Sequence, residues 1–304
     1  MAIFSPHTRV AVIRGGQSSG YDDSLKTGEH ILSALRDMSE TYEPLDIFIS
    51  KDGEWHRGGL VHEPHRALEY VDIVWNALHG LYGEDGQVQR ILESLQIPFT
   101  GSSAVASALA MNKDMAKRLY QKHSLLTPAH ELITEKDLNE DQLIDIFRNY
   151  LPPVVVKSAR VSGSLSVSLA HTFNELKQSI KGAFTQSPRV LVEEFVKGDK
   201  ISCAVIEGVK GERTYALPPS SESKLKLTVE ENKEIEGMAK RAHEALGLSH
   251  YSSSDFIITP RKKIYILETN SLPALHQDSL TRQSLHAIDW RPRDFVSHVL
   301  RLAM

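Results

Sequence analysis

The sequence predicts an α/β protein that opens with a parallel sheet. Apolar runs of strand length occupy residues 9–13, 45–49 and 72–78. Segments with helical spacing of apolar residues, 23–37 and 87–95, follow the first and the third run. Strands and helices that alternate at these lengths are typical of a parallel sheet with both faces covered. We therefore expect an N-terminal parallel-sheet domain.

A glycine-rich turn, RGGQSSG, follows the first predicted strand and leads directly into a helix. This order makes an anion site, because backbone N–H groups and the helix N-terminus can face a ligand; an ordinary turn without a ligand fits equally well. His79 ends the third strand, and ligands bind at such strand ends. His79 and Glu84 therefore either contact a ligand or cap the strand end.

Further elements follow along the chain. We expect a helix over 103–122 and another that begins at Thr134 in a capping box with Asp137. The remaining expectations are strands 154–157 and 165–169 around the loop 158–164, a helix over 173–184, strands 189–196 and 201–206 as a hairpin, a polar stretch 217–227 without regular structure, and helices 228–246 and 295–302. The loop after Lys157 is rich in Ser and Gly, so lysine and backbone donors together could cover nucleotide phosphates.

The segment 255–270, DFIITPRKKIYILETN, predicts a strand, a tight turn and a returning strand. The turn brings Asp255 close to Glu268 and Asn270. The last two lie two positions apart, so their side chains leave the same face of the strand. Carboxylate and amide oxygens are the donors that Mg²⁺ with nucleotide phosphates requires. The alternative is an ordinary hairpin with solvated acids.

Composition narrows the class of protein. The chain has 304 residues, 41% hydrophobic and 24% charged, which suits a globular protein of two or three domains. Its net charge of −4 implies no bulk attraction to nucleic acid or membrane. The single cysteine, Cys203, lies in an apolar run and predicts buried packing in a reducing compartment. The N-terminus lacks the apolar core of a signal peptide and no run approaches membrane-spanning length, so we expect a cytoplasmic protein.

Six stretches together resemble the D-alanine–D-alanine ligases of the ATP-grasp superfamily, and they span nearly the whole chain. The block HG-x-x-GEDG with GS-x-x-x-ASALAM-x-K is specific to that family. The six stretches are VAVIRGGQSS, ALHGLYGEDG, IPFTGSSAVASALAMNKDMAKRL, VVVKSARVSGSLSVS, VLVEEFVKG and DFIIT…IYILETNSLP. The resemblance implies an N-terminal domain over 1–106 and two α+β ATP-grasp subdomains, a central one over 107–202 and a C-terminal one with the metal site over 203–304.

The resemblance also implies an activity. Such ligases use ATP with Mg²⁺ or Mn²⁺ to phosphorylate the carboxylate of one D-alanine, and the amine of a second D-alanine attacks the acyl phosphate. The product is a dipeptide precursor of peptidoglycan. The implied partners are small amino-acid substrates and a second copy of the chain, which makes a homodimer through the N-terminal domain.

Roles for individual residues follow from the same resemblance. Lys113 and Lys157 would bind phosphates, and Asp255, Glu268 and Asn270 would hold the metal. His79 would lie near the first substrate, and Ser279 would grip the carboxylate of the second. The residues implied along the adenine and ribose are Glu193, Glu194, Phe195, Val196, Asp199 and Lys200.

Several positions depart from the family pattern. Gly20 stands where the family has a glutamate for the first amino group, with Asp22 and Asp23 displaced from it. Ser253 stands where the family has an oxyanion-binding arginine, and losing one such donor reduces rates by about 10²–10³-fold. The remaining departures are Lys200 at the ribose-binding acid, Ala274 for a glycine, and a lid shortened to 217–227 with Lys224 and Lys226 as substitutes.

Three hypotheses remain open at this point. The chain is a ligase that forms D-alanyl-D-alanine, an ATP-binding homologue that has lost dipeptide ligation, or a ligase for a different pair of amino acids. In the last case Asp22 or Asp23 and Lys224 would take over the displaced roles.

Overall fold

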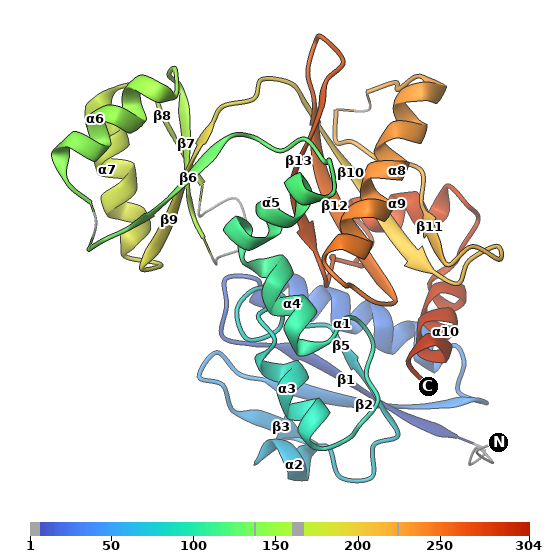
Figure 1. The fold of residues 1–304 in the computed structure, drawn as a ribbon. Helices are drawn as coiled ribbons and strands as arrows, with labels where there is room; N and C mark the ends of the chain where they lie inside the picture. Colours follow the sequence, from blue (N-terminus) through green and yellow to red (C-terminus); the bar gives the residue numbers. More distant parts are fainter. Residues whose placement is uncertain (1–6, 137, 160–166, 224) are drawn as a thin grey trace.

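Three β-sheets organise the protein, and each anchors one unit of the chain (Figure 1). The structure is a computed structural model that describes residues 7–136, 138–159, 167–223 and 225–304. The N-terminal unit lies at the bottom of Figure 1, the central unit at the upper left and the C-terminal unit at the upper right.

The N-terminal sheet has the order β4-β3-β2-β1-β5. The three strands that correspond to the predicted apolar runs are parallel to one another, as expected, and most of their apolar side chains are buried. The strands are β1 (Thr8–Gly15), β2 (Tyr42–Ile49), β3 (Trp55–Arg57), β4 (Leu60–His62) and β5 (Ile73–Asn76), and the helices are α1 (Tyr21–Arg36), α2 (Pro64–Ala67) and α3 (Gln87–Ser94). The short antiparallel strands β3 and β4 at one end of this sheet were not predicted, since three residues are too short to show an alternating pattern.

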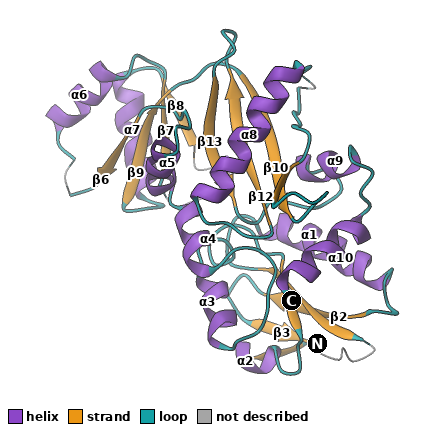
Figure 2. Cartoon of the chain, turned by 45° about the vertical axis from the view of Figure 1, so that its right-hand side comes forward, coloured by secondary structure: helices purple, strands orange, loops and turns teal. Residues whose placement is uncertain are grey.

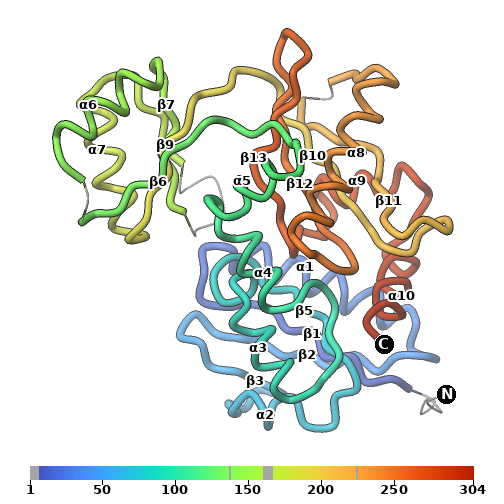
Figure 3. Tube along the Cα trace, in the orientation of Figure 1, coloured from blue at the N-terminus to red at the C-terminus, as the bar shows by residue number. Residues whose placement is uncertain are grey.

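Two helices, α4 (Ala104–Met111) and α5 (Lys113–Lys122), replace the single helix expected over 103–122. The break falls at Asn112, whose side chain accepts a hydrogen bond from the Met115 amide and so caps a new helix. Figure 3 shows this part of the chain leading from the N-terminal unit to the place where the other two sheets meet.

The central sheet has the order β6-β9-β7-β8, with two helices packed against it (Figure 2). Its elements are β6 (His130–Thr134), α6 (Glu140–Asn149), β7 (Val154–Ser158), β8 (Val167–Ala170), α7 (Phe173–Phe184) and β9 (Arg189–Glu194). The helix expected from Thr134 was wrong: Thr134 ends strand β6, and α6 begins after Asn139, which accepts from the Gln142 amide. Asp137 and residues 160–164 of the predicted loop lie outside the described residues.

The C-terminal sheet has the order β11-β10-β12-β13. Its elements are β10 (Asp199–Glu207), β11 (Thr214–Ala216), α8 (Val229–Ala245), β12 (Tyr251–Ile258), β13 (Ile264–Asn270), α9 (Leu280–His286) and α10 (Pro292–Ala303). The hairpin expected between 189–196 and 201–206 was wrong, because β9 and β10 belong to different sheets. Between them Gly198 passes so close to β12 that an added Cβ would lie 2.2 Å from the Ile258 carbonyl oxygen.

One hydrophobic core joins the N-terminal and C-terminal units. It contains Val12 and Trp75 from the first sheet together with Tyr251 and Phe295 from the C-terminal unit. Helix α10 accordingly packs beside α1 (Figure 1). The central unit has a separate core built from its own sheet and helices.

We propose that these three units are the domains of the chain. The division expected between 202 and 203 falls inside β10, so we place it in the connection 195–198 instead. No helix in the described part of the chain is both long and apolar enough to cross a membrane.

Candidate active site

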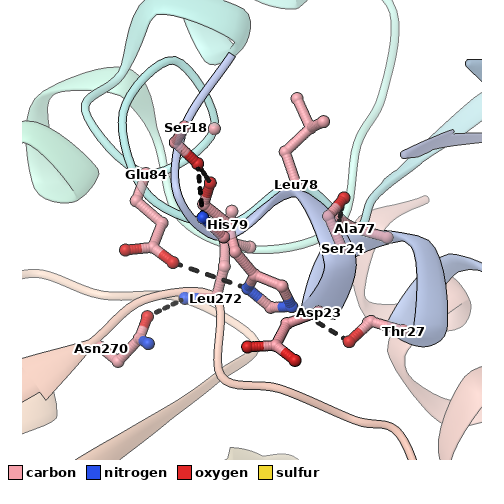
Figure 4. A network of polar contacts seen from close by, with 12 residues as sticks. Ser18, Asp23, Ser24, Thr27, Ala77, Leu78, His79, Glu84, Asn270 and Leu272 are labelled. Carbon is pink, nitrogen blue, oxygen red and sulfur yellow. Dashed lines mark hydrogen bonds and ion pairs between the residues drawn. The ribbon is translucent and has the colours of Figure 1, made fainter. Parts of the chain in front are cut away.

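The β12–β13 hairpin brings the predicted metal-binding side chains together. Asp255 lies opposite Glu268, and Ser253 lies opposite Asn270. A register shift directly after Asp255 separates this polar end from the regular apolar pairing that follows. Asn270 is fixed by a 2.9 Å hydrogen bond from the Leu272 amide to its side-chain oxygen, Oδ1 (Figure 4).

Both carboxylates of the hairpin pair with a lysine. Lys113 Nζ lies 2.9 Å from Glu268 Oε2, and Lys200 Nζ lies 2.8 Å from Asp255 Oδ2. Charge on Lys113 lowers the pKa of Glu268 to about 2. Burial raises the pKa of Asp255 despite its pairing with Lys200. Anionic phosphates would therefore compete for the lysines, and a cation would compete for the carboxylates.

Two further ion pairs involve Glu193, which is 1% exposed. Lys157 Nζ lies 2.8 Å from its Oε2 atom, and Lys117 Nζ lies 3.3 Å from its Oε1 atom. Lys117 is fully buried, and burial lowers the pKa of its ammonium to about 8. Lys117 was not predicted as a site residue, although its position one helical turn after Lys113 places it on the same face of α5.

A cavity of about 290 Å³ lies between the central and C-terminal sheets. It collects most of the residues that the sequence suggested for nucleotide binding. Its lining includes Lys113, Lys157, Glu193, Glu194, Phe195, Val196, Lys200, Asp255 and Glu268.

A smaller cavity of about 30 Å³ adjoins the first one. Lys113 and Glu268 line both cavities, while Glu84 and Asn270 line only the smaller one. The Lys113–Glu268 ion pair thus separates a nucleotide-sized space from a space that reaches the N-terminal unit.

His79 lies beside Glu84, which lines the smaller cavity (Figure 4). Its two ring nitrogens are both engaged, since Nε2 lies 3.0 Å from Thr27 Oγ1 and Nδ1 lies 3.5 Å from Glu84 Oε1. These contacts fix the ring orientation, and the side chain is 8% exposed.

Gly20 packs directly against His79. A Cβ added at Gly20 would lie 2.8 Å from the His79 Cβ, so no acidic side chain fits there without displacing His79. Asp23 instead projects from the first turn of α1 into this region (Figure 4). Its Oδ1 atom lies 4.0 Å from His276 Nε2, and its side chain is 57% exposed.

The remaining predicted residues lie around the cavities rather than in their lining. Ser253 is 7% exposed and its hydroxyl lies 2.9 Å from that of Ser202. Ser279 caps helix α9, where its hydroxyl accepts from the Arg282 amide and donates to the His276 carbonyl. Asp199 is exposed at the start of β10.

The start of the short segment, residues 217–223, lies along the C-terminal sheet. Ser220 forms an isolated bridge to Ser202 of β10, and Ser284 of α9 donates to the Pro218 carbonyl at 2.8 Å. Burial lowers the pKa of Lys200, but the negative charge of Asp255 outweighs it and the pKa is raised. Glu222 adds a smaller contribution in the same direction as Asp255. Lys224 lies outside the described residues, and Lys226 is exposed.

The hairpin residues fit a hard divalent cation. Asp255, Glu268 and Asn270 offer only oxygen donors, and each carboxylate has a lysine that can turn to phosphate when a cation arrives. Among the described residues no group of three His, Cys, Asp or Glu side chains could hold a metal ion. The hairpin set differs from such a group because its third donor is an amide.

A nucleotide-sized cavity between two antiparallel sheets, with lysines from both sides and a carboxylate pair at one end, defines the ATP-grasp class of proteins. Models of two regions of one family match the chain. The D-ala D-ala ligase N-terminus matches residues 57–102, and the D-ala D-ala ligase C-terminus matches residues 119–221 and 212–301. The chain belongs to the D-alanine–D-alanine ligase family.

Individual relatives agree with this membership. The D-alanine–D-alanine ligase of Geotalea uraniireducens is 31% identical over 97% of this chain and 95% of its own length. The D-alanine–D-alanine ligase of Bacillus anthracis, solved in complex with ATP, is 27% identical with a TM-score of 0.82 over 97% of this chain and 96% of its own. The enzyme from Coxiella burnetii shares the fold with a TM-score of 0.88 at 22% identity, over 98% of this chain and 94% of its own.

Proposed function

We propose that the chain is an ATP-dependent ligase that joins two D-alanine molecules through an acyl phosphate. The observation that carries the proposal is the Lys113–Glu268 pair, which lines both the nucleotide-sized cavity and the smaller cavity beside it. A phosphoryl group can pass from nucleotide to amino acid only where two such spaces meet. Membership of the ligase family, with relatives that match almost the whole chain, supports the same reaction.

Residues on both sides of the Lys113–Glu268 pair take part in the proposed reaction. Lys113 and Lys157 bind phosphate oxygens, and backbone groups of 193–196 bind the adenine with Phe195 as an apolar wall. Asp255, Glu268 and Asn270 would hold Mg²⁺ or Mn²⁺, which would supply positive charge to neutralise the phosphates.

The reaction then proceeds in two steps. In the first, a carboxylate oxygen of the first amino acid bonds to the γ-phosphorus, and the bond from that phosphorus to the bridging oxygen breaks to leave ADP. In the second, the amine of the second amino acid attacks the acyl carbon, phosphate leaves with its electron pair, and the amine loses a proton. We assign the contacts with the second and the first amino acid to Ser279 and His79, as the family resemblance implies.

Purified protein tests the proposal directly. With ATP, Mg²⁺ and D-alanine we expect equal amounts of phosphate and dipeptide, and chelation of the metal should stop both. ATP binding without phosphate release, across a panel of D-amino acids, would instead favour a homologue that only binds the nucleotide. Dipeptide formed faster from another pair of amino acids would change the substrate assignment and leave the reaction type intact.

We propose that Asp23 binds the ammonium group of the first amino acid. Gly20 has no room for the acid that the family places there, whereas Asp23 lies in the same region within 4.0 Å of His276. Asp23→Asn should raise the KM for the first amino acid by about 10-fold, the effect of losing one charged hydrogen bond, and leave the KM for ATP unchanged. Initial rates at saturating ATP measure this. Asp22→Asn is the matched control, and equal effects of the two substitutions would contradict the assignment.

We also propose that the chain forms a homodimer through its N-terminal unit. Strand β4 is an edge strand, and its Leu60 and Val61 side chains are 67% and 56% exposed. Sedimentation should give a dimer, and Leu60→Glu with Val61→Lys should give monomers. Leu151→Glu, at another exposed apolar position, is the control that should stay dimeric. A monomer at every concentration of the unmodified protein would contradict the proposal.

A further inference from the structure

Lys117 holds a buried ammonium group at the junction between two units. It lies on α5, which packs against β13 and α8 of the C-terminal unit. Its Nζ donates to Thr127 Oγ1 at 2.9 Å and to the Pro128 carbonyl at 3.3 Å, both in the connection to the central sheet. The third neighbour is Glu193 Oε1 at 3.3 Å, on β9 of that sheet. Two hydrogen bonds and one ion pair therefore hold the ammonium group, and the buried Oε1 atom of Glu193 accepts no hydrogen bond from the described residues.

Two lysines share the single carboxylate of Glu193. Lys157 Nζ lies 2.8 Å from Oε2 and Lys117 Nζ lies 3.3 Å from Oε1. Only Lys157 lines the nucleotide-sized cavity; Lys117 is fully buried behind it. The cluster carries one positive charge more than its carboxylate balances, which suits the arrival of an anion in the cavity.

Lys157 cannot serve Glu193 and a phosphate equally well at the same time. When the Lys157 ammonium turns to a phosphate oxygen, its ion pair with Glu193 is weakened or lost. The Glu193 carboxylate nevertheless remains buried, at 1% exposure. A buried carboxylate without a partner is strongly unfavourable. Lys117 is the neighbour already in place to compensate it, because its position is fixed by Thr127 and Pro128.

We propose that Lys117 is a positioning residue that retains the Glu193 carboxylate and so releases Lys157 to bind the nucleotide phosphates. This inference rests on the proposed function, since it requires ATP in the cavity. Without Lys117, the one close charged partner that Glu193 keeps in the described part of the chain is Lys157, which Glu193 then holds away from the phosphates. The role is specific to phosphate, so it does not extend to the adenosine part of the nucleotide.

Calorimetry on the full chain tests the inference with ATP and with adenosine as separate probes. Lys117→Met should weaken ATP binding by about 10- to 100-fold, the equivalent of one charged hydrogen bond, and leave adenosine binding unchanged. Adding Glu193→Gln to Lys117→Met should restore ATP affinity, because Lys157 is then free. Lys122→Met, at an exposed position at the end of α5, should bind both probes like the unmodified protein.

Each outcome has a distinct meaning. Equal ATP affinity in Lys117→Met and the unmodified protein would overturn the inference alone, as would an equal loss for ATP and adenosine, which indicates a general structural role. If the unmodified protein fails to bind ATP, the proposed function and the inference fall together. If Lys117→Met does not fold, Glu193→Gln alone decides: we expect it to bind ATP more tightly than the unmodified protein, and weaker ATP binding with unchanged adenosine binding would overturn the inference.

Discussion

Replacing Glu268 by glutamine is expected to lower ATP-dependent phosphate release by about a thousandfold. Glu268 faces Asp255 across the hairpin, and its carboxylate pairs with Lys113 where the two cavities meet. Glutamine keeps the size of the side chain but removes one of two negative charges available to a divalent cation. Charge stabilisation by a bound metal contributes several kcal/mol to such reactions, and each 1.36 kcal/mol corresponds to a tenfold change in rate.

The effect of Glu268→Gln on binding should depend on the metal. ATP affinity in the presence of Mg²⁺ should fall, whereas ATP affinity with EDTA should not fall, because Lys113 loses the carboxylate that competes with phosphate. Glu234→Gln, an exposed position on α8, is the control for a simple change of net charge. Phosphate release by the Glu268→Gln protein at the rate of the unmodified protein would contradict a role for Glu268 in the active site.

Local patterns predicted the elements that bury a regular apolar face. The hairpin at 255–270 and the helix over Phe173–Phe184 have clear periodicity, and the structure has both. The helix start expected at Thr134 failed because Thr134 and Asn139 are both good capping residues, and only packing against β9 makes the first one part of a strand. Whether β9 and β10 pair with each other depends on the sheets around them, which no local pattern encodes.

The candidate site also contains residues that a local pattern reveals and residues that only the fold brings together. Oxygen donors spaced by two on one strand can be recognised in the sequence, so Glu268 and Asn270 were predicted together. The partners of those donors come from distant segments, as Lys113 does for Glu268, and their identity requires the fold. Lys117 was missed for a related reason, since a lysine in an amphipathic helix is expected to be solvated, yet this one is enclosed by the connection to β6.

Replacing Trp75 by alanine is expected to lower the free energy of unfolding by about 3–5 kcal/mol, as for other large aromatic side chains removed from a core. Trp75 is fully buried on β5, stacked on Tyr251 at 6.1 Å and edge-on to Phe295 at 6.0 Å between ring centroids. Those two rings come from β12 and α10, so the substitution opens a cavity between the N-terminal and C-terminal units. Chemical denaturation measures the loss.

Hydrogen exchange identifies the elements whose stability falls in the Trp75→Ala protein. Because one core joins the two units, amide protection should fall together in β1 and in β12, while the central sheet keeps its protection. Ile146→Ala is the matched control: Ile146 is fully buried in the separate core of the central unit, so it should lower protection only in β6–β9. If Trp75→Ala reduced protection in the first sheet and left β12 unchanged, the two units would unfold independently, and the shared core would not fix their relative position around the proposed amino-acid site.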